Sequence, residues 1–158
     1  MAYNRQKAVA YARRWAYGFN PLFYNFDQIG GDCTNFASQC LFAGGLPMNF
    51  TPVFGWYYLN VNNRAPAWTG VNELYDFLIT NTEKGPKAVE VGFDRIELAD
   101  LIQLDFGGDG RFDHTPIIVD VGRRTPETIL VAAHSYAAYR RPLATYNYRA
   151  IRCLHIFD

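Results

Sequence analysis

The feature that most constrains the fold is a change of sequence pattern near residue 88. Before it, apolar residues recur at the three- and four-residue spacing of amphipathic helices, in segments 4–17, 33–43 and 70–81. After it, short runs rich in β-branched residues predict strands. These runs are AVEVGF (88–93), DLIQLDF (100–106), HTPIIVDV (114–121), ETILVAAHS (127–135) and IRCLHIF (151–157), with turn sequences GGDG and GRRTPE between them. The order predicts an α+β fold in which N-terminal helices pack on a C-terminal antiparallel sheet.

Length and composition favour one folded domain over residues 1–158. Of these residues, 49% are hydrophobic, which is enough for a sizeable core. The 15 basic and 15 acidic residues cancel, so the basic footprint of a nucleic-acid-binding protein is missing and no such partner is expected. The apolar runs are strand-sized, so no membrane span is expected. Charges interrupt the N-terminal segment, which excludes a signal peptide in this chain but is compatible with an excised domain of a larger exported protein.

The segment GGDCTNFASQC, residues 30–40, places a thiol directly behind two glycines and an acid. The glycines allow a tight turn, and Asp32 is a suitable N-cap for a helix whose first turn contains Cys33. Cys33 shares its helix face with Phe36, Ala37 and Cys40. Seven residues along one helix separate the two thiols by roughly 10 Å, too far for a disulfide. The third cysteine makes the count odd, so at least one thiol is free.

Cysteine catalysis requires a thiolate, a base that generates it and a polar group that fixes the base. A helix N-terminus beside an imidazolium lowers a thiol pKa, whereas the neighbouring charge of Asp32 raises it. His114 begins a predicted strand and His134 ends the next one, so a hairpin would present them side by side. A buried cysteine is otherwise a small hydrophobe, our interpretation of Cys40 and Cys153.

These motifs carry a resemblance to a known family. GGDCTNFASQCLFAGG, PAWTGVNELYDFL, LIQLDF, HTPIIVDVG and LVAAHS are similar to the bacterial putative amidase domain, a branch of the papain-like cysteine hydrolases related to NlpC and CHAP cell-wall peptidases. The resemblance covers essentially the whole chain. It implies Cys33 as nucleophile, His114 as general base and His134 as the residue that orients the base. The Cys33 N–H and Gln28 are the implied oxyanion-hole candidates.

The same resemblance implies an amide substrate in a peptide or peptidoglycan fragment, no metal and no cofactor, and an exported or cell-wall location. Two other classes stay open. Cys33, His114 and His134 are three possible ligands of a zinc hydrolase, although no HExxH or CxxC motif is present. The second open class is a non-catalytic cell-wall or protein-binding module with the same fold.

Residues 50–70 have no clear period, which predicts a long loop. Four aromatic residues stand in or beside it: Trp56, Tyr57, Tyr58 and Trp68. They are candidates for the wall of a substrate groove, and equally for a hydrophobic cover over the sheet.

Overall fold

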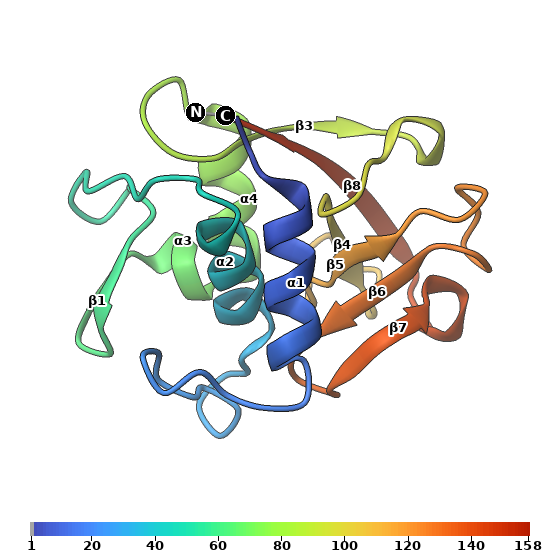
Figure 1. The fold of residues 1–158 in the computed structure, drawn as a ribbon, viewed down its shortest axis with the longest axis horizontal. Coiled ribbons are helices and arrows are strands. Elements are labelled where there is room, and N and C mark those ends of the chain that lie inside the picture. Colours follow the sequence, from blue (N-terminus) through green and yellow to red (C-terminus); the bar gives the residue numbers. More distant parts are fainter. Residues whose placement is uncertain (1) are drawn as a thin grey trace.

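The computed structural model describes residues 2–158 and has two layers, helices on one side and a sheet on the other (Figure 1). The helices are α1 (Arg5–Trp15), α2 (Cys33–Ala43), α3 (Pro66–Thr69) and α4 (Val71–Thr80), with single 3₁₀ turns η1 (Phe93–Arg95) and η2 (Leu143–Thr145). The three predicted long helices are confirmed. Asn4 caps α1 as predicted, since its side-chain oxygen accepts a hydrogen bond from the Lys7 N–H at 3.0 Å.

The main sheet has six strands in the order β3-β8-β4-β5-β6-β7, and every neighbouring pair is antiparallel. Its strands are β3 (Lys87–Val91), β4 (Leu101–Asp105), β5 (Ile117–Asp120), β6 (Leu130–Ala133), β7 (Ala138–Pro142) and β8 (Ala150–Phe157). The α+β prediction is confirmed. The last strand of the chain lies between β3 and β4, so β3 is joined to the rest of the sheet through β8.

Two parts of the prediction need correction. The segment 50–70 is not one long loop, because it contains β1 (Tyr58–Asn60), β2 (Asn63–Arg64) and the short helix α3. These elements are too short to produce a recognisable period. Strand β7 was also missed. It is an edge strand with arginines in place of an apolar alternation, and such a strand is held by backbone pairing more than by buried side chains.

Helix α2 lies at the centre of the molecule. Residues 33–41 are all buried, so the predicted single inward face is too narrow a description. A helix buried all round must be enclosed by other elements, and α1 lies alongside it while α3 packs against it (Figure 1). One hydrophobic cluster fills the space between these helices and the sheet, and a second cluster covers the opposite sheet face. The first turn of α2 is therefore enclosed by other elements around its circumference, and only its N-terminal end is open.

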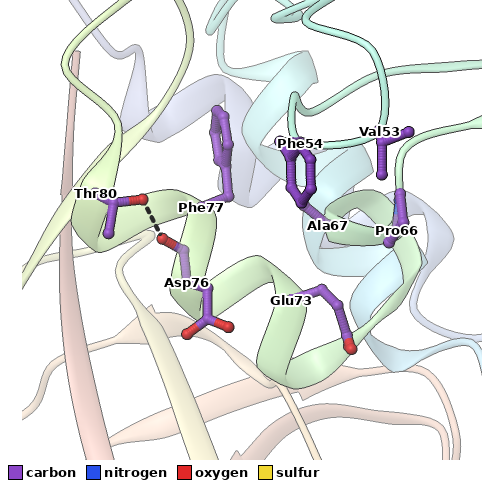
Figure 2. A pocket seen from close by; sticks show the side chains of 8 residues that line it. All are labelled: Val53, Phe54, Pro66, Ala67, Glu73, Asp76, Phe77 and Thr80. Carbon is purple, nitrogen blue, oxygen red and sulfur yellow. Dashed lines mark hydrogen bonds between the residues drawn. The ribbon is translucent and has the colours of Figure 1, made fainter.

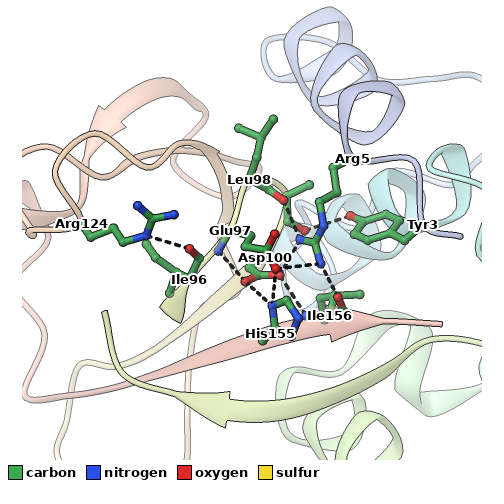
Figure 3. A network of polar contacts seen from close by, with 10 residues as sticks. Tyr3, Arg5, Ile96, Glu97, Leu98, Asp100, Arg124, His155 and Ile156 are labelled. Carbon is green, nitrogen blue, oxygen red and sulfur yellow. Dashed lines mark hydrogen bonds and ion pairs between the residues drawn. The ribbon is translucent and has the colours of Figure 1, made fainter. Parts of the chain in front are cut away.

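A polar network ties the two ends of the chain to the sheet (Figure 3). The fully buried carboxylate of Asp100 accepts hydrogen bonds from the Arg5 guanidinium at 2.8 Å and from the Ile156 N–H at 2.9 Å. The same carboxylate lies 3.1 Å from Nδ1 of His155. His155 thus belongs to this local polar network and stands apart from His114 and His134.

Candidate active site

Cys33 and His114 line the same pocket, which has a volume of about 460 Å³. Cys33 is the first residue of α2, and the preceding Gly30 and Gly31 have φ angles of +82° and +98°. These angles lie in the left-handed region that glycine adopts without strain, which lets the chain turn sharply into the helix. The remaining lining residues are Asp27, Gln28, Gly30, Gly31, Phe106, Asp113, Ser135 and Tyr136.

Asp32 stands at the predicted N-cap position, but its side chain makes no capping hydrogen bond, so that part of the prediction is wrong. Its Oδ1 accepts from the Phe26 N–H at 2.8 Å and from the Asn35 amide at 2.9 Å. Its Oδ2 lies 2.5 Å from Nδ1 of His134. Since the carboxylate turns away from the helix end, it leaves the first-turn N–H groups available to another acceptor.

His134 does not contact His114, so its predicted role in orienting the base is corrected. Ile117 of β5 pairs with Ala132 of β6, and the same register places position 134 opposite Thr115. Successive residues alternate between the faces of a sheet, so His114 belongs to the other face. In agreement, the His134 ring stacks on Phe36 of α2 at a centroid distance of 4.0 Å.

Both ring nitrogens of His134 face acceptors. Nδ1 meets the Asp32 carboxylate, and Nε2 lies 2.7 Å from the backbone oxygen of Trp15. A carbonyl oxygen accepts only, and the carboxylate also accepts two N–H donors, as an ionised group does. Both nitrogens of His134 are therefore engaged, and the His134–Asp32 pair is buried where α1 ends and α2 begins. His134 is a structural residue of the site's frame.

His114 stands at the other face of the sheet, beside Phe106 and Tyr146. An isolated backbone bridge to Leu104 holds its main chain. Its side chain is buried, and Nε2 has no hydrogen-bond partner among residues 2–158. Burial, aided by the charge of Arg141, lowers the His114 pKa from 6.5 to about 4. His114 is thus a neutral imidazole at pH 7, with the capacity to accept a proton.

The thiol of Cys33 is also neutral at pH 7. Burial raises its pKa, and the charge of Asp32 raises it further. Favourable interactions with the backbone at Thr115 and with Thr34 oppose this increase without reversing it. The thiolate–imidazolium pair expected from the sequence is consequently not the resting state, because both members favour their uncharged forms. The predicted opposing effect of Asp32 is confirmed.

Several residues that support the pocket are not recognisable from the sequence. The Ser135 hydroxyl accepts a hydrogen bond from the Asp32 N–H at 2.8 Å, which ties the end of β6 to the head of α2. Thr34 and Thr115 join their hydroxyls at 3.0 Å beneath the thiol. Nothing in the local sequence distinguishes these hydroxyls from surface ones, because their contacts cross 81 to 103 residues of chain.

Gln28 lines the pocket, but its role as an oxyanion donor stays a prediction. The Cys33 backbone N–H at the start of α2 stays the other candidate. A helix N-terminus presents such groups with the positive end of its dipole, which suits an oxygen on which negative charge develops.

The predicted aromatic groove is corrected, because three of its four members are buried. Trp56 and Trp68 are completely buried, with centroids 4.5 Å apart, and none of the four aromatic residues lines the pocket of Cys33. Their indole N–H groups donate inward, Trp56 to Ser38 and Trp68 to Asn35. Tyr58 is also buried. The alternative prediction, a hydrophobic cover, describes these side chains.

The zinc alternative fails on geometry. His134 cannot join Cys33 and His114 as a ligand, since Asp32 and the Trp15 carbonyl occupy its ring nitrogens. Within the described part of the chain, no three histidine, cysteine, aspartate or glutamate side chains gather as metal ligands would.

A second pocket, of about 300 Å³, lies between α3, α4 and the loop that carries Phe54 (Figure 2). Its walls are mostly apolar, and Glu73 and Asp76 of α4 stand at its edge. No thiol or imidazole lines it. Because no thiol and imidazole pair lines it, this pocket is a weaker candidate for an active site than the Cys33 pocket.

Fold and site together define an α+β domain in which a cysteine at the head of a buried helix and a histidine near the start of a strand share one pocket. The chain belongs to the putative amidase domain family, whose model matches residues 2–157. The family description supports an amidase-like domain with hydrolytic activity. No solved structure matches the chain.

Two relatives come from Bacillus subtilis strain 168. The chain is 39% identical over 119 residues to the uncharacterized protein YhbB, covering 74% of this chain and 37% of that protein. It is 26% identical over 140 residues to the uncharacterized protein YjcM, covering 84% and 31%. The chain thus spans about a third of the length of these relatives. Across residues 2–158, no helix has both the length and the apolar character needed to traverse a bilayer.

Proposed function

We propose that this chain is a papain-like cysteine amidase or peptidase of the NlpC and CHAP branch, with Cys33 as nucleophile and His114 as general base. The observation that carries the proposal is that these two side chains, 81 positions apart in the sequence, line one pocket at the N-terminus of α2. The family match supports the hydrolytic class.

The neutral state of both groups suggests the order of proton movements. His114 removes the thiol proton as the Cys33 sulfur attacks the amide carbonyl, and the N–H groups at the head of α2 stabilise the resulting oxyanion. The C–N bond then breaks, and the proton on His114 passes to the leaving amine. Water attacks the thioester while His114 takes one of its protons, and the thiol is released with the carboxylic acid product.

The proposed substrate is an amide in bacterial peptidoglycan or a related peptide, cleaved by a longer exported or cell-wall-associated protein of which this chain is a domain. The relatives, about three times as long as the matched region, are consistent with a larger parent protein.

The direct test is incubation of the chain with purified peptidoglycan and with stem-peptide fragments, followed by mass spectrometry of the products. Cys33→Ala and His114→Ala should each lower the cleavage rate by about 10²-fold or more. Cys153→Ala, which removes a buried thiol that does not line the pocket, is the matched control and should retain activity. Cleavage that survives Cys33→Ala would refute the proposal. Binding of wall fragments by the intact chain without cleavage would favour the non-catalytic module.

A further inference from the structure

Two buried side-chain atoms lack a hydrogen-bond partner within residues 2–158: Nε2 of His114 and the hydroxyl oxygen of Tyr146. A buried polar atom without a partner is unfavourable, so each such atom requires an explanation. These two belong to neighbouring rings, with centroids 5.6 Å apart and planes inclined by 49°. The two atoms do not bond to each other, but because the rings are neighbours, one water between them would satisfy both.

Tyr146 is held in this position from its outer side. The guanidinium carbon of Arg141 lies 3.6 Å from the centroid of the Tyr146 ring. Arg141 is itself fixed by hydrogen bonds to the Thr145 hydroxyl at 2.7 Å and to the Thr145 backbone oxygen at 3.0 Å. The phenol ring therefore has little freedom to move away from His114, and it packs in the hydrophobic cluster on the same sheet face.

The catalytic role proposed for His114 requires one particular tautomer. A neutral imidazole carries one proton, and the hydrogen bond made by one nitrogen decides which nitrogen is left as acceptor. If Nε2 carries the proton and donates it to a fixed acceptor, Nδ1 is free to accept the proton of Cys33. His134 cannot impose this state, because its own ring nitrogens bind Asp32 and the Trp15 carbonyl.

We propose that Tyr146 is the positioning residue for His114: its hydroxyl oxygen accepts a hydrogen bond from Nε2–H through one bridging water, and so keeps Nδ1 as the proton acceptor. The inference rests on the proposed function for its catalytic meaning, since it assigns the third member of that site. It places the third member on the loop after η2, next to His114 in space and 32 positions away in sequence.

The test uses Tyr146→Phe, which removes only the hydroxyl. Tyr148→Phe is the matched control, because it removes a hydroxyl from the same loop, whereas the ring that neighbours His114 is that of Tyr146. The first readout is the pair of ¹⁵N chemical shifts of His114 at pH 7, which distinguish the Nε2–H from the Nδ1–H tautomer. We expect Nε2–H in the parent chain and in Tyr148→Phe, and a mixture or the opposite tautomer in Tyr146→Phe. Unchanged shifts in Tyr146→Phe would overturn the inference.

The second readout is the rate at which iodoacetamide alkylates Cys33 at pH 7, located by mass spectrometry. His114→Ala and Tyr146→Phe should both slow alkylation, by about tenfold or more for the loss of a working base. If His114→Ala leaves the rate unchanged, the proposed function fails. If His114→Ala slows it and Tyr146→Phe does not, only the positioning role fails. A circular dichroism melt of each variant establishes that the fold is retained, which is expected because Tyr146→Phe keeps the buried ring and removes only the hydroxyl.

Discussion

Asp32 and His134 lie 2.5 Å apart, Oδ2 to Nδ1, so the residue beside the candidate nucleophile is bound to a residue 102 positions later. Both side chains are almost fully buried. This buried pair joins the head of α2 to the end of β6, and residues at both of these places line the Cys33 pocket. The position of the nucleophile therefore depends on a long-range electrostatic contact as well as on the helix itself.

Breaking this pair should destabilise the fold strongly. Asp32→Asn removes one partner of a buried His–Asp pair, for which we expect a loss of about 3–5 kcal/mol in the free energy of unfolding, measured by urea denaturation. Asp27→Asn changes an exposed acid of the same loop and should stay within about 0.5 kcal/mol of the parent chain. A loss below about 1 kcal/mol for Asp32→Asn would show that this buried pair is not a main source of stability.

His114 should make stability depend on pH in the acid range. Its pKa is about 4 in the folded chain and 6.5 as an ordinary histidine. Between these values the unfolded chain binds a proton that the folded chain does not, so stability is full above pH 6.5 and falls as the pH drops towards 4. The contribution at pH 4 is about 3 kcal/mol. His114→Gln should flatten this part of the profile, and urea titrations at pH 4 and 7 measure the difference. Parallel profiles for the two proteins would show that His114 is not buried as a neutral group.

Cys33 should behave as a protected thiol in the absence of substrate. Because burial raises its pKa, alkylation by iodoacetamide should be slow at pH 6 and should accelerate above pH 9. The same chain unfolded in urea supplies the reference rate of an unprotected thiol. Fast alkylation with a midpoint below pH 7 would instead reveal a resting thiolate–imidazolium pair, as the sequence alone had suggested.

Trp68 should contribute mainly to the stability of the fold and not to substrate binding. Its side chain is completely buried, and its indole N–H donates to Asn35, which in turn donates to Asp32. Trp68→Ala should therefore cost about 3–5 kcal/mol in the free energy of unfolding. Phe54→Ala, at a side chain that is 82% exposed, is the control and should change stability by less than about 0.5 kcal/mol. If Trp68→Ala keeps its stability and loses only substrate binding, Trp68 would instead belong to a substrate groove, as the sequence had predicted.

Local patterns were sufficient for much of the fold. The three long helices, the capping Asn4 and five of the six strands of the main sheet follow from apolar periodicity and from turn residues, because these features depend on neighbours a few positions away. The short elements of residues 50–70 and the polar edge strand β7 cannot be predicted in this way, since neither produces a periodic apolar pattern. The placement of Cys33 in a first helical turn likewise follows from Gly30, Gly31 and the helical spacing after them.

What only the tertiary structure decided is the partnership of each polar side chain. The sequence marks Asp32, Cys33, His114 and His134 as candidates, but strand register determines that His134 pairs with Asp32 while His114 faces Tyr146 on the other side of the sheet. A shift of one residue exchanges the two faces of a strand, and no local pattern around a single histidine records that choice. The protonation states of Cys33 and His114 are likewise decided by the tertiary structure. Burial raises the pKa of Cys33 and lowers that of His114, because the penalty for an unscreened charge depends on what surrounds the group in space.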